Sequence, residues 1–341
     1  MIRASIPWVR GTSIRGHTHT GFPKRSCFKG AAIMDHKKTP NHHRRLNRRS
    51  FLDAAGRLAG GGLAVGAIFE TIRPSSAWGQ RPAKETHPSS ARVVDRFKTH
   101  LSFQISVDVG TLDLGLTVAS AALAGGVDIV EMGTPLLKTQ GVSNVVPAFR
   151  KRFPDALLLA DMKTMDGGAG EARGVYAGGG NIVDFLALAG ADTAKSICAV
   201  RDEFRRAGPE LPRLVFSDIM VPHQGPAAQA GEIALRMVEA GVDAVGIYLQ
   251  FDARRANPKL IEDDYLSEVA RAVFERIGKA APVQVVGGLS IAQAKSLAKA
   301  GLRAFVISGN MGLPDGNARY NLPPADIQRL VAGFIAEVSG G

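Results

Sequence analysis

The order of apolar runs from residue 99 onward is the feature of this chain that most limits its fold. Eight strand-like runs alternate with helix-like stretches, which is the rhythm of a parallel sheet built from βα units. The runs are Ser102–Asp108, Val127–Met132, Ala156–Asp161, Asn181–Leu188, Arg213–Met220, Val242–Leu249, Val283–Gly287 and Arg303–Ser308. Eight such units within residues 99–341 predict an α/β protein of the (βα)8 TIM barrel class.

A doubly wound open sheet is the alternative that shares this βα rhythm. An open sheet that binds a dinucleotide has a glycine-rich turn, G-x-G-x-x-G, after its first strand. The chain has Asp108-Val109-Gly110-Thr111 at that place and no such motif. The closed barrel is therefore the favoured prediction.

The positive charge of the chain is confined to its first 79 residues. The whole sequence has a formal net charge of +11, with 42 basic and 31 acidic residues. Residues 1–79 contain 14 of the basic residues and three of the acidic ones, so residues 80–341 contain 28 of each kind. A charge-neutral barrel gives no support to nucleic-acid binding, which depends on clustered Lys and Arg.

The same first 79 residues have the order of parts found in an export signal. Arginines precede an Ala/Gly/Leu-rich stretch, and the segment 47–52 resembles a twin-arginine signal. Small residues around Ala77 and Gly79 suit a signal peptidase, and translation could also start at Met34. We expect a leader at 1–79, a polar linker at 80–98 and a barrel at 99–341. The barrel would be periplasmic or otherwise exported, or cytoplasmic if the signal is not used.

The apolar stretch of the leader, from Ala54 to Phe69, is glycine-rich and interrupted by Arg57. A membrane-spanning helix needs about 20 apolar residues. Contact with a membrane is therefore expected only in transit, during export. A disordered basic tail or an amphipathic helix is the alternative interpretation of the leader.

Acidic and basic side chains gather at the predicted C-terminal end of the third strand, in the segment Asp161–Asp166. Side chains alternate across a strand, so Asp161 and Lys163 point to the same side. Ionised groups are tolerated beside a buried strand when they pair, bind a metal or meet a ligand. The segment therefore predicts an active site or, as the simpler alternative, a structural ion pair.

Other predicted strands also end in polar residues, at the face where barrel enzymes have their active sites. These residues are Asp108 at the end of the first strand, Glu131 at the end of the second, Asp218 at the end of the fifth, and Tyr248 with Gln250 at the end of the sixth. Carboxylates on adjacent strands suit Mg²⁺, which prefers oxygen ligands. Glu131 and Asp161 are therefore the candidate metal ligands.

Glycine turns follow the last two predicted strands, as Gly287-Gly288 and Gly309-Asn310. Barrels often bind phosphate at this place through backbone N–H groups and a helix N-terminus. Ordinary turn formation explains either pair by itself. Both turns together favour a phosphate-binding site made by these four residues.

Three segments of the chain are similar to the 3-hexulose-6-phosphate synthase family, which belongs to the orotidine 5′-phosphate decarboxylase suprafamily. The segments are Ser106–Asp108, Glu131–Lys138 and Leu159–Gly167, and the likeness extends over about residues 99–315. Gly-Thr-Pro in the second segment and Lys-Thr-Met-Asp in the third favour the synthase over the decarboxylases. The absence of an arginine after Gly309 favours it as well.

The resemblance implies a ribulose-phosphate-binding barrel that assembles as a homodimer with shared active sites. It implies a Mg²⁺-dependent lyase that joins formaldehyde to ribulose 5-phosphate, a small sugar phosphate, through an enediolate. Glu131 and Asp161 would hold the metal. Lys163 would stabilise the enediolate, Asp108 would bind substrate hydroxyls, and Asp166 would reach into the partner subunit's site.

The sixth predicted strand departs from the family pattern. The family has a histidine near the end of this strand, whereas the chain has Ile247-Tyr248-Leu249-Gln250. A tyrosine is a much weaker acid than an imidazolium at neutral pH, so Tyr248 does not simply inherit an acid–base role. His223 is a candidate substitute. The alternatives are a related sugar-phosphate or orotidine 5′-phosphate-type decarboxylase, and an exported barrel that binds a ligand without turnover.

Overall fold

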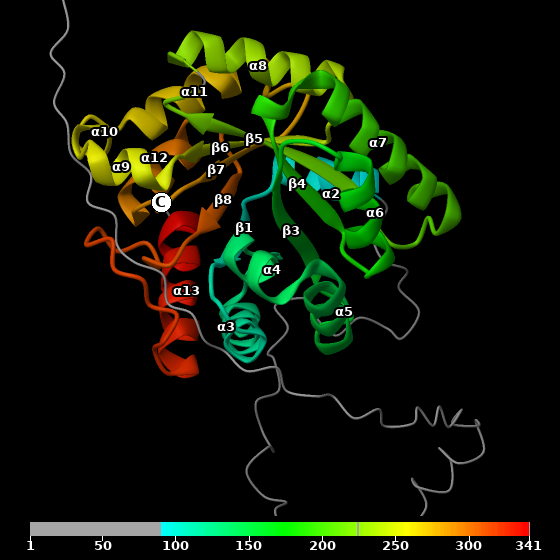
Figure 1. Ribbon diagram of the computed structural model, residues 1–341. Helices are drawn as coiled ribbons and strands as arrows, with labels where there is room; N and C mark the ends of the chain where they lie inside the picture. The colour runs from blue at the N-terminus through cyan, green and yellow to red at the C-terminus, as the bar shows by residue number, and fades with distance from the viewer. Residues whose placement is uncertain (1–89, 224, 341) are drawn as a thin grey trace, which may run out of the picture. The chain divides into compact units, whose positions relative to one another are not determined.

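The strands of this protein close into a barrel. The structure, a computed structural model, describes residues 90–223 and 225–340. Its parallel strands pair in sequence order, and β1 pairs with β8 to complete the ring (Figure 1). The strands are β1 (Ser102–Val107), β2 (Ile129–Met132), β3 (Leu157–Thr164), β4 (Ile182–Leu186), β5 (Leu214–Val221), β6 (Ala244–Leu249), β7 (Val283–Val286) and β8 (Ala304–Ile307). The predicted (βα)8 barrel is confirmed, and all eight predicted strands are present with slightly shifted ends.

Helices surround the barrel (Figure 1). They are α2 (Ser90–Thr99), α3 (Leu112–Gly125), α4 (Thr134–Gln140), α5 (Val142–Arg152), α6 (Gly168–Ala177), α7 (Gly190–Ala207), α8 (Ala227–Glu239), α9 (Phe251–Ala256), α10 (Lys259–Glu262), α11 (Tyr265–Ile277), α12 (Ile291–Lys299) and α13 (Pro324–Ser339). A 3₁₀ turn, η1 (Ala187–Ala189), precedes α7. Helix α13 packs against α3, so the last described helix closes the ring beside the first βα unit.

The two faces of each strand have different roles. In β1, Phe103, Ile105 and Val107 belong to the apolar core between strands and helices, whereas Gln104 and Ser106 line the interior. Along β5 the inward positions change from apolar Leu214 and Phe216 to the carboxylate Asp218. The barrel is therefore apolar inside at the N-terminal ends of its strands and polar at their C-terminal ends.

Helix α2 corrects the predicted linker at residues 80–98. Val93 and Phe97, one helical turn apart, are buried in a small apolar cluster with residues at the N-terminal ends of the strands. The Phe97 ring meets the Phe216 ring edge-on, with centroids 6.2 Å apart. Ser90 Oγ donates to the carbonyl oxygen of Arg213 at 3.0 Å. This segment is mostly polar, so its composition did not indicate the apolar pair Val93 and Phe97. The pair covers the N-terminal end of the barrel.

The predicted leader, with its twin-arginine signal, lies outside the described residues, as does the first part of the predicted linker. Among the helices at residues 90–223 and 225–340, none is long and apolar enough to cross a membrane.

Candidate active site

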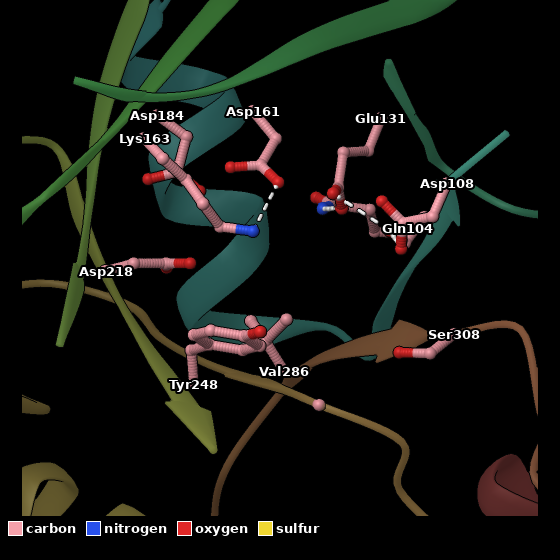
Figure 2. A pocket seen from close by; sticks show the side chains of 12 residues that line it. Gln104, Asp108, Glu131, Asp161, Lys163, Asp184, Asp218, Tyr248, Val286 and Ser308 are labelled. Carbon is pink, nitrogen blue, oxygen red and sulfur yellow. Dashed lines mark hydrogen bonds and ion pairs between the residues drawn. The ribbon is translucent and has the colours of Figure 1, made fainter. Parts of the chain in front are cut away.

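A cavity of about 420 Å³, measured to its open mouth, lies at the C-terminal ends of the strands. Figure 2 shows side chains that point into it from different strands. The lining residues are Gln104, Ser106, Asp108, Glu131, Asp161, Lys163, Asp184, Asp218, Tyr248, Val286, Gly287 and Ser308. Six of the ten predicted site residues are in this set, and the other four are Asp166, Gly288, Gly309 and Asn310. The structure thus brings together residues from β1 to β7, and Ser308 directly after β8, at the face where the sequence predicts the site.

Three carboxylates meet in this cavity. Asp108, Glu131 and Asp161 each offer an oxygen within 4.8 Å of the others. Burial, followed by the charges of Asp161 and Asp108, raises the pKa of Glu131 well above its ordinary value. Asp161 Oδ1 is buried and has no hydrogen-bond partner among the described residues. Three clustered carboxylates with an unsatisfied oxygen on Asp161 fit a hard divalent cation such as Mg²⁺, and Asp108 adds a third candidate ligand to the two predicted ones.

The turn after β2 positions two of these carboxylates. A Cβ at Gly133 would lie 2.3 Å from Asp108 Oδ1, so only glycine leaves room for that side chain. Thr134 Oγ1 lies 2.6 Å from Asp161 Oδ2 and 2.9 Å from the Asp161 carbonyl oxygen. The Gly-Thr dipeptide therefore fixes the approach of Asp108 on one side and of Asp161 on the other.

Glu131 is held by residues that the sequence interpretation missed. Gln104 Nε2 donates to Glu131 Oε2, and Gln284 Nε2 donates to Gln104 Oε1 at 3.0 Å. Ser106 Oγ lies 3.0 Å from Glu131 Oε1 and 2.8 Å from Asp108 Oδ2. The sequence does contain a signal for Gln104 and Ser106. Polar residues stand at every second position along β1 and at Asp108 directly after it, which places all three side chains on one side.

Lys163 lies beside Asp161, as the alternation of side chains predicts. Its Nζ is 3.0 Å from Asp161 Oδ2, and it lies over the Tyr248 ring at 4.9 Å from the centroid. The strand is irregular here, because its register with β4 shifts between Asp161 and Thr164 and Lys163 has a φ of 46°. Burial lowers the pKa of Lys163, but Asp161 and Tyr248 outweigh that effect and raise it above its ordinary value. The side chain therefore stays a cation.

Two further acids, Asp184 on β4 and Asp218 on β5, also face the cavity. Each is 5% exposed, and each has one oxygen without a hydrogen-bond partner among the described residues. Burial and the neighbouring Asp218 raise the pKa of Asp184 well above its ordinary value. Burial and the Asp161 charge raise the pKa of Asp218 to about 7. Asp218 is thus suited to exchange a proton near neutral pH.

Tyr248, rather than His223, occupies the sixth-strand side of the cavity. Its hydroxyl accepts a hydrogen bond from the Phe251 N–H at 3.3 Å. Burial raises the pKa of Tyr248 further above the pH range in which a phenol could act as a base. His223 is exposed, contacts Gln250 through its Nε2 and does not line the cavity.

The two glycine turns are joined to each other. Gly288 N–H donates to Ser308 Oγ at 3.2 Å. Asn310 Nδ2 lies 3.2 Å from the Gly288 carbonyl oxygen, and it also contacts the Leu289 and Leu313 carbonyl oxygens. The Nδ2 group of Asn310 therefore fastens the two turns together, so the donor that this residue could offer to a phosphate is its backbone N–H. Gly287, with a φ of 109°, is the member of the predicted set that lines the cavity.

Asp166 lies on the exposed turn after β3 and does not line the cavity of its own chain. Its Oδ1 accepts a hydrogen bond from the Gly167 N–H at 2.7 Å. Its predicted role in the partner subunit's site stays a prediction.

Known proteins are similar to this chain in sequence and in fold. The chain is 29% identical over 217 residues to a 3-hexulose-6-phosphate synthase of Mycobacterium gastri, which covers 61% of this chain and 90% of the relative. It is 31% identical over 108 residues to a probable 3-keto-L-gulonate-6-phosphate decarboxylase of Haemophilus influenzae, covering 32% of this chain and 47% of the relative. A crystal structure of a 3-hexulose-6-phosphate synthase superposes with a TM-score of 0.54 at 26% identity, covering 69% of this chain and 99% of that one.

These relatives are enzymes by name, and the first of them matches the family that the three sequence segments indicate. Residues 101–309 match the family described as orotidine 5′-phosphate decarboxylase / HUMPS. That match covers more than half of the chain and includes all eight strands. The chain therefore belongs to the orotidine 5′-phosphate decarboxylase / HUMPS family.

Proposed function

We propose that this protein is an aldehyde-lyase of the 3-hexulose-6-phosphate synthase type, which joins formaldehyde to ribulose 5-phosphate with the help of Mg²⁺. The observation that carries the proposal is the composition of the cavity, where five carboxylates surround a single lysine. Such an excess of negative charge in a buried space is stabilised by a bound cation. The likeness to named synthases over 90% of a relative's length supports the same reaction.

Asp108, Glu131 and Asp161 would hold the cation. When bound, Mg²⁺ would act as a Lewis acid for the oxygens of an enediolate. Lys163 is already a cation beside Asp161 and would lie next to the same developing negative charge. Tyr248 has a positioning role, because the stacking of Lys163 on the Tyr248 ring fixes the direction of the lysine side chain.

The proposed reaction moves one proton and makes one C–C bond. C1 of ribulose 5-phosphate loses a proton to give the enediolate, C1 then attacks the formaldehyde carbon, and the former carbonyl oxygen of formaldehyde takes up a proton. The new carbon becomes C1, so the ketone becomes C3 of the hexulose. Asp218 would serve as the group that takes and returns this proton, because its pKa of about 7 suits both steps and no imidazole lines the described cavity.

A sugar-phosphate decarboxylase is the second candidate function. The likeness to a probable 3-keto-L-gulonate-6-phosphate decarboxylase favours it, and it would use the same stabilisation of an enediolate. An exported barrel that binds a sugar phosphate without turnover is the non-enzymatic alternative.

One assay separates these candidates. The full chain would be incubated with Mg²⁺ and either ribulose 5-phosphate plus formaldehyde or 3-keto-L-gulonate 6-phosphate, with formaldehyde loss and CO₂ release measured. We expect formaldehyde loss that disappears with a chelator and in Asp161→Ala. The control Asp155→Ala changes an exposed acid before β3 and should behave like the parent chain. CO₂ release without formaldehyde loss would instead assign the decarboxylase, and a folded protein with neither activity would leave the binding protein.

We propose in addition that the protein is exported through the twin-arginine route. The support is the predicted signal at residues 47–52 and the confinement of the positive charge to residues 1–79. A chain carrying Arg48→Lys and Arg49→Lys should stay in the cytoplasm, and fractionation of cells that make both forms measures this. Equal distribution of the two forms would refute the proposal.

A further inference from the structure

Arg254 of α9 lies over the turn that follows β7. Its Nη1 donates to the Gly287 carbonyl oxygen at 3.1 Å. A Cβ at Gly288 would lie 2.2 Å from the same Nη1, so the guanidinium occupies the space that any side chain at Gly288 would need. A cation from the β6–β7 connection is thus built into the turn at the edge of the cavity.

We propose that Arg254 binds the phosphate group of the substrate. The proposal rests on the proposed function, because it assigns a residue to the phosphate end of a sugar phosphate. Gly287, whose carbonyl oxygen Arg254 contacts, lines the cavity. A phosphate placed against the Gly287–Gly288 turn would therefore lie within reach of the guanidinium.

The negative charge of the cavity requires a cation beside the phosphate of a bound substrate. Five carboxylates line it, and Lys163 is paired with Asp161 at 3.0 Å. A phosphate dianion entering this field would be repelled unless a separate cation faced it. The bound metal of the proposed function would lie at the carboxylates, on the side of the cavity formed by β1 to β3. The phosphate end, at β7 and β8, needs a cation of its own.

Arg254 is better placed for this role than Arg319, which contacts the Gly309–Asn310 turn. Arg319 Nη1 donates to the Asn310 carbonyl oxygen, and its Nη2 forms an ion pair with Asp315. Its charge is already compensated. Arg254, in contrast, has no ion pair with any acid in the part of the chain that the structure describes.

The guanidinium of Arg254 is held in place while part of it stays available. It stacks on the Phe251 ring, with Cζ 5.3 Å from the centroid, and its one hydrogen bond within residues 90–223 and 225–340 uses Nη1. An arginine has five N–H donors in a planar fork that matches two oxygens of a phosphate. Stacking and the Gly287 contact limit its freedom before a ligand arrives, which lowers the entropic cost of binding.

The test uses binding, with formaldehyde left out. Isothermal titration calorimetry on the full chain with Mg²⁺ would give the Kd of ribulose 5-phosphate and of unphosphorylated ribulose, for the parent chain, Arg254→Gln and Arg255→Gln. Arg255 is the matched control, because its guanidinium stacks on the same Phe251 ring at 5.4 Å, whereas the hydrogen bond to the Gly287 carbonyl oxygen comes from Arg254. Circular dichroism would verify that each variant is folded.

We expect Arg254→Gln to weaken ribulose 5-phosphate binding by about 10- to 100-fold, the range for loss of a charge-assisted hydrogen bond. Arg255→Gln should leave that Kd within about twofold, and neither variant should change the response to ribulose. Equal weakening by both variants, or no binding of ribulose 5-phosphate by the folded parent chain, overturns the inference. Selective weakening in a protein that does not consume formaldehyde would support Arg254 while refuting the proposed reaction.

Discussion

Gly246 on β6 makes room for the carboxylate of Asp218 on β5. The two residues are partners in the strand register, and a Cβ at position 246 would lie 1.8 Å from Asp218 Oδ1. At the level of Asp218 on β5, the neighbouring strand β6 therefore has no side chain, because its residue there is Gly246. The position of Asp218 inside the cavity depends on this glycine.

Gly246→Ala should therefore displace the Asp218 carboxylate and lower kcat by about 100-fold, within the range for loss of a general acid–base group. Steady-state formaldehyde consumption measures the change. Gly333→Ala is the control, since that glycine is at an exposed position of α13 with no atom near its Cβ position, and alanine favours helix there. Unchanged kcat in Gly246→Ala would remove Asp218 from the proposed mechanism.

The buried acids should make the metal-free protein less stable as the pH rises. Folded Asp218 keeps its proton up to a pKa of about 7, whereas the unfolded chain releases it near 3.8. The folded state therefore binds more protons between these values, and the free energy of unfolding falls as pH rises through that window. We expect Tm in a chelator to drop by about 5 °C or more from pH 5 to pH 7.5.

Asp218→Asn should reduce this drop, because an amide has no proton to release. Added Mg²⁺ should raise Tm most at the higher pH, where the carboxylates are ionised. Differential scanning calorimetry across the pH series measures both effects. A stability that rises from pH 5 to pH 7.5 without metal would contradict the raised pKa values.

Helix α2 should contribute stability without taking part in catalysis. Phe97→Ala removes the ring that meets Phe216 inside the apolar cluster at the N-terminal end of the barrel. A loss of about 3–5 kcal/mol in the free energy of unfolding is expected for such a buried ring. Urea unfolding measures it, with exposed Arg92→Ala as the control. Because the cavity lies at the opposite strand ends, kcat of the folded variant should stay near that of the parent chain.

The predicted homodimer with shared active sites can be tested by complementation between two inactive variants. Asp166 does not line its own cavity, whereas Lys163 does, so Lys163→Met and Asp166→Asn would damage opposite halves of a shared site. In a mixed dimer one of the two sites would keep both residues. Refolding the variants together should then restore about a quarter of the parent activity by random pairing. A mixture as inactive as its components would show that Asp166 does not act across an interface.

Much of the fold and the core of the candidate site could be predicted from the sequence. The order of apolar runs is a local property, so the eight strands and the barrel followed from it. The shared direction of Asp161 and Lys163 also followed from alternation along a strand, although the register with β4 shifts between Asp161 and Thr164. The prediction of a linker up to residue 98 was wrong for the helix Ser90–Thr99. The role of Val93 and Phe97 depends on the strand ends that they cover, which are distant in the sequence.

The sequence by itself determined which residues are inward-facing at the strand ends, since that depends on a repeat of two along each strand. Closure of the barrel decided which of these residues meet. It brought Gln104 of β1 against Gln284 of β7, 180 positions apart, and Arg254 against Gly287. It also set five carboxylates around one lysine, where burial and mutual repulsion raise the pKa values of Asp108, Glu131, Asp184 and Asp218. Such through-space effects depend on the three-dimensional neighbours of a residue, and these are set by the tertiary structure alone.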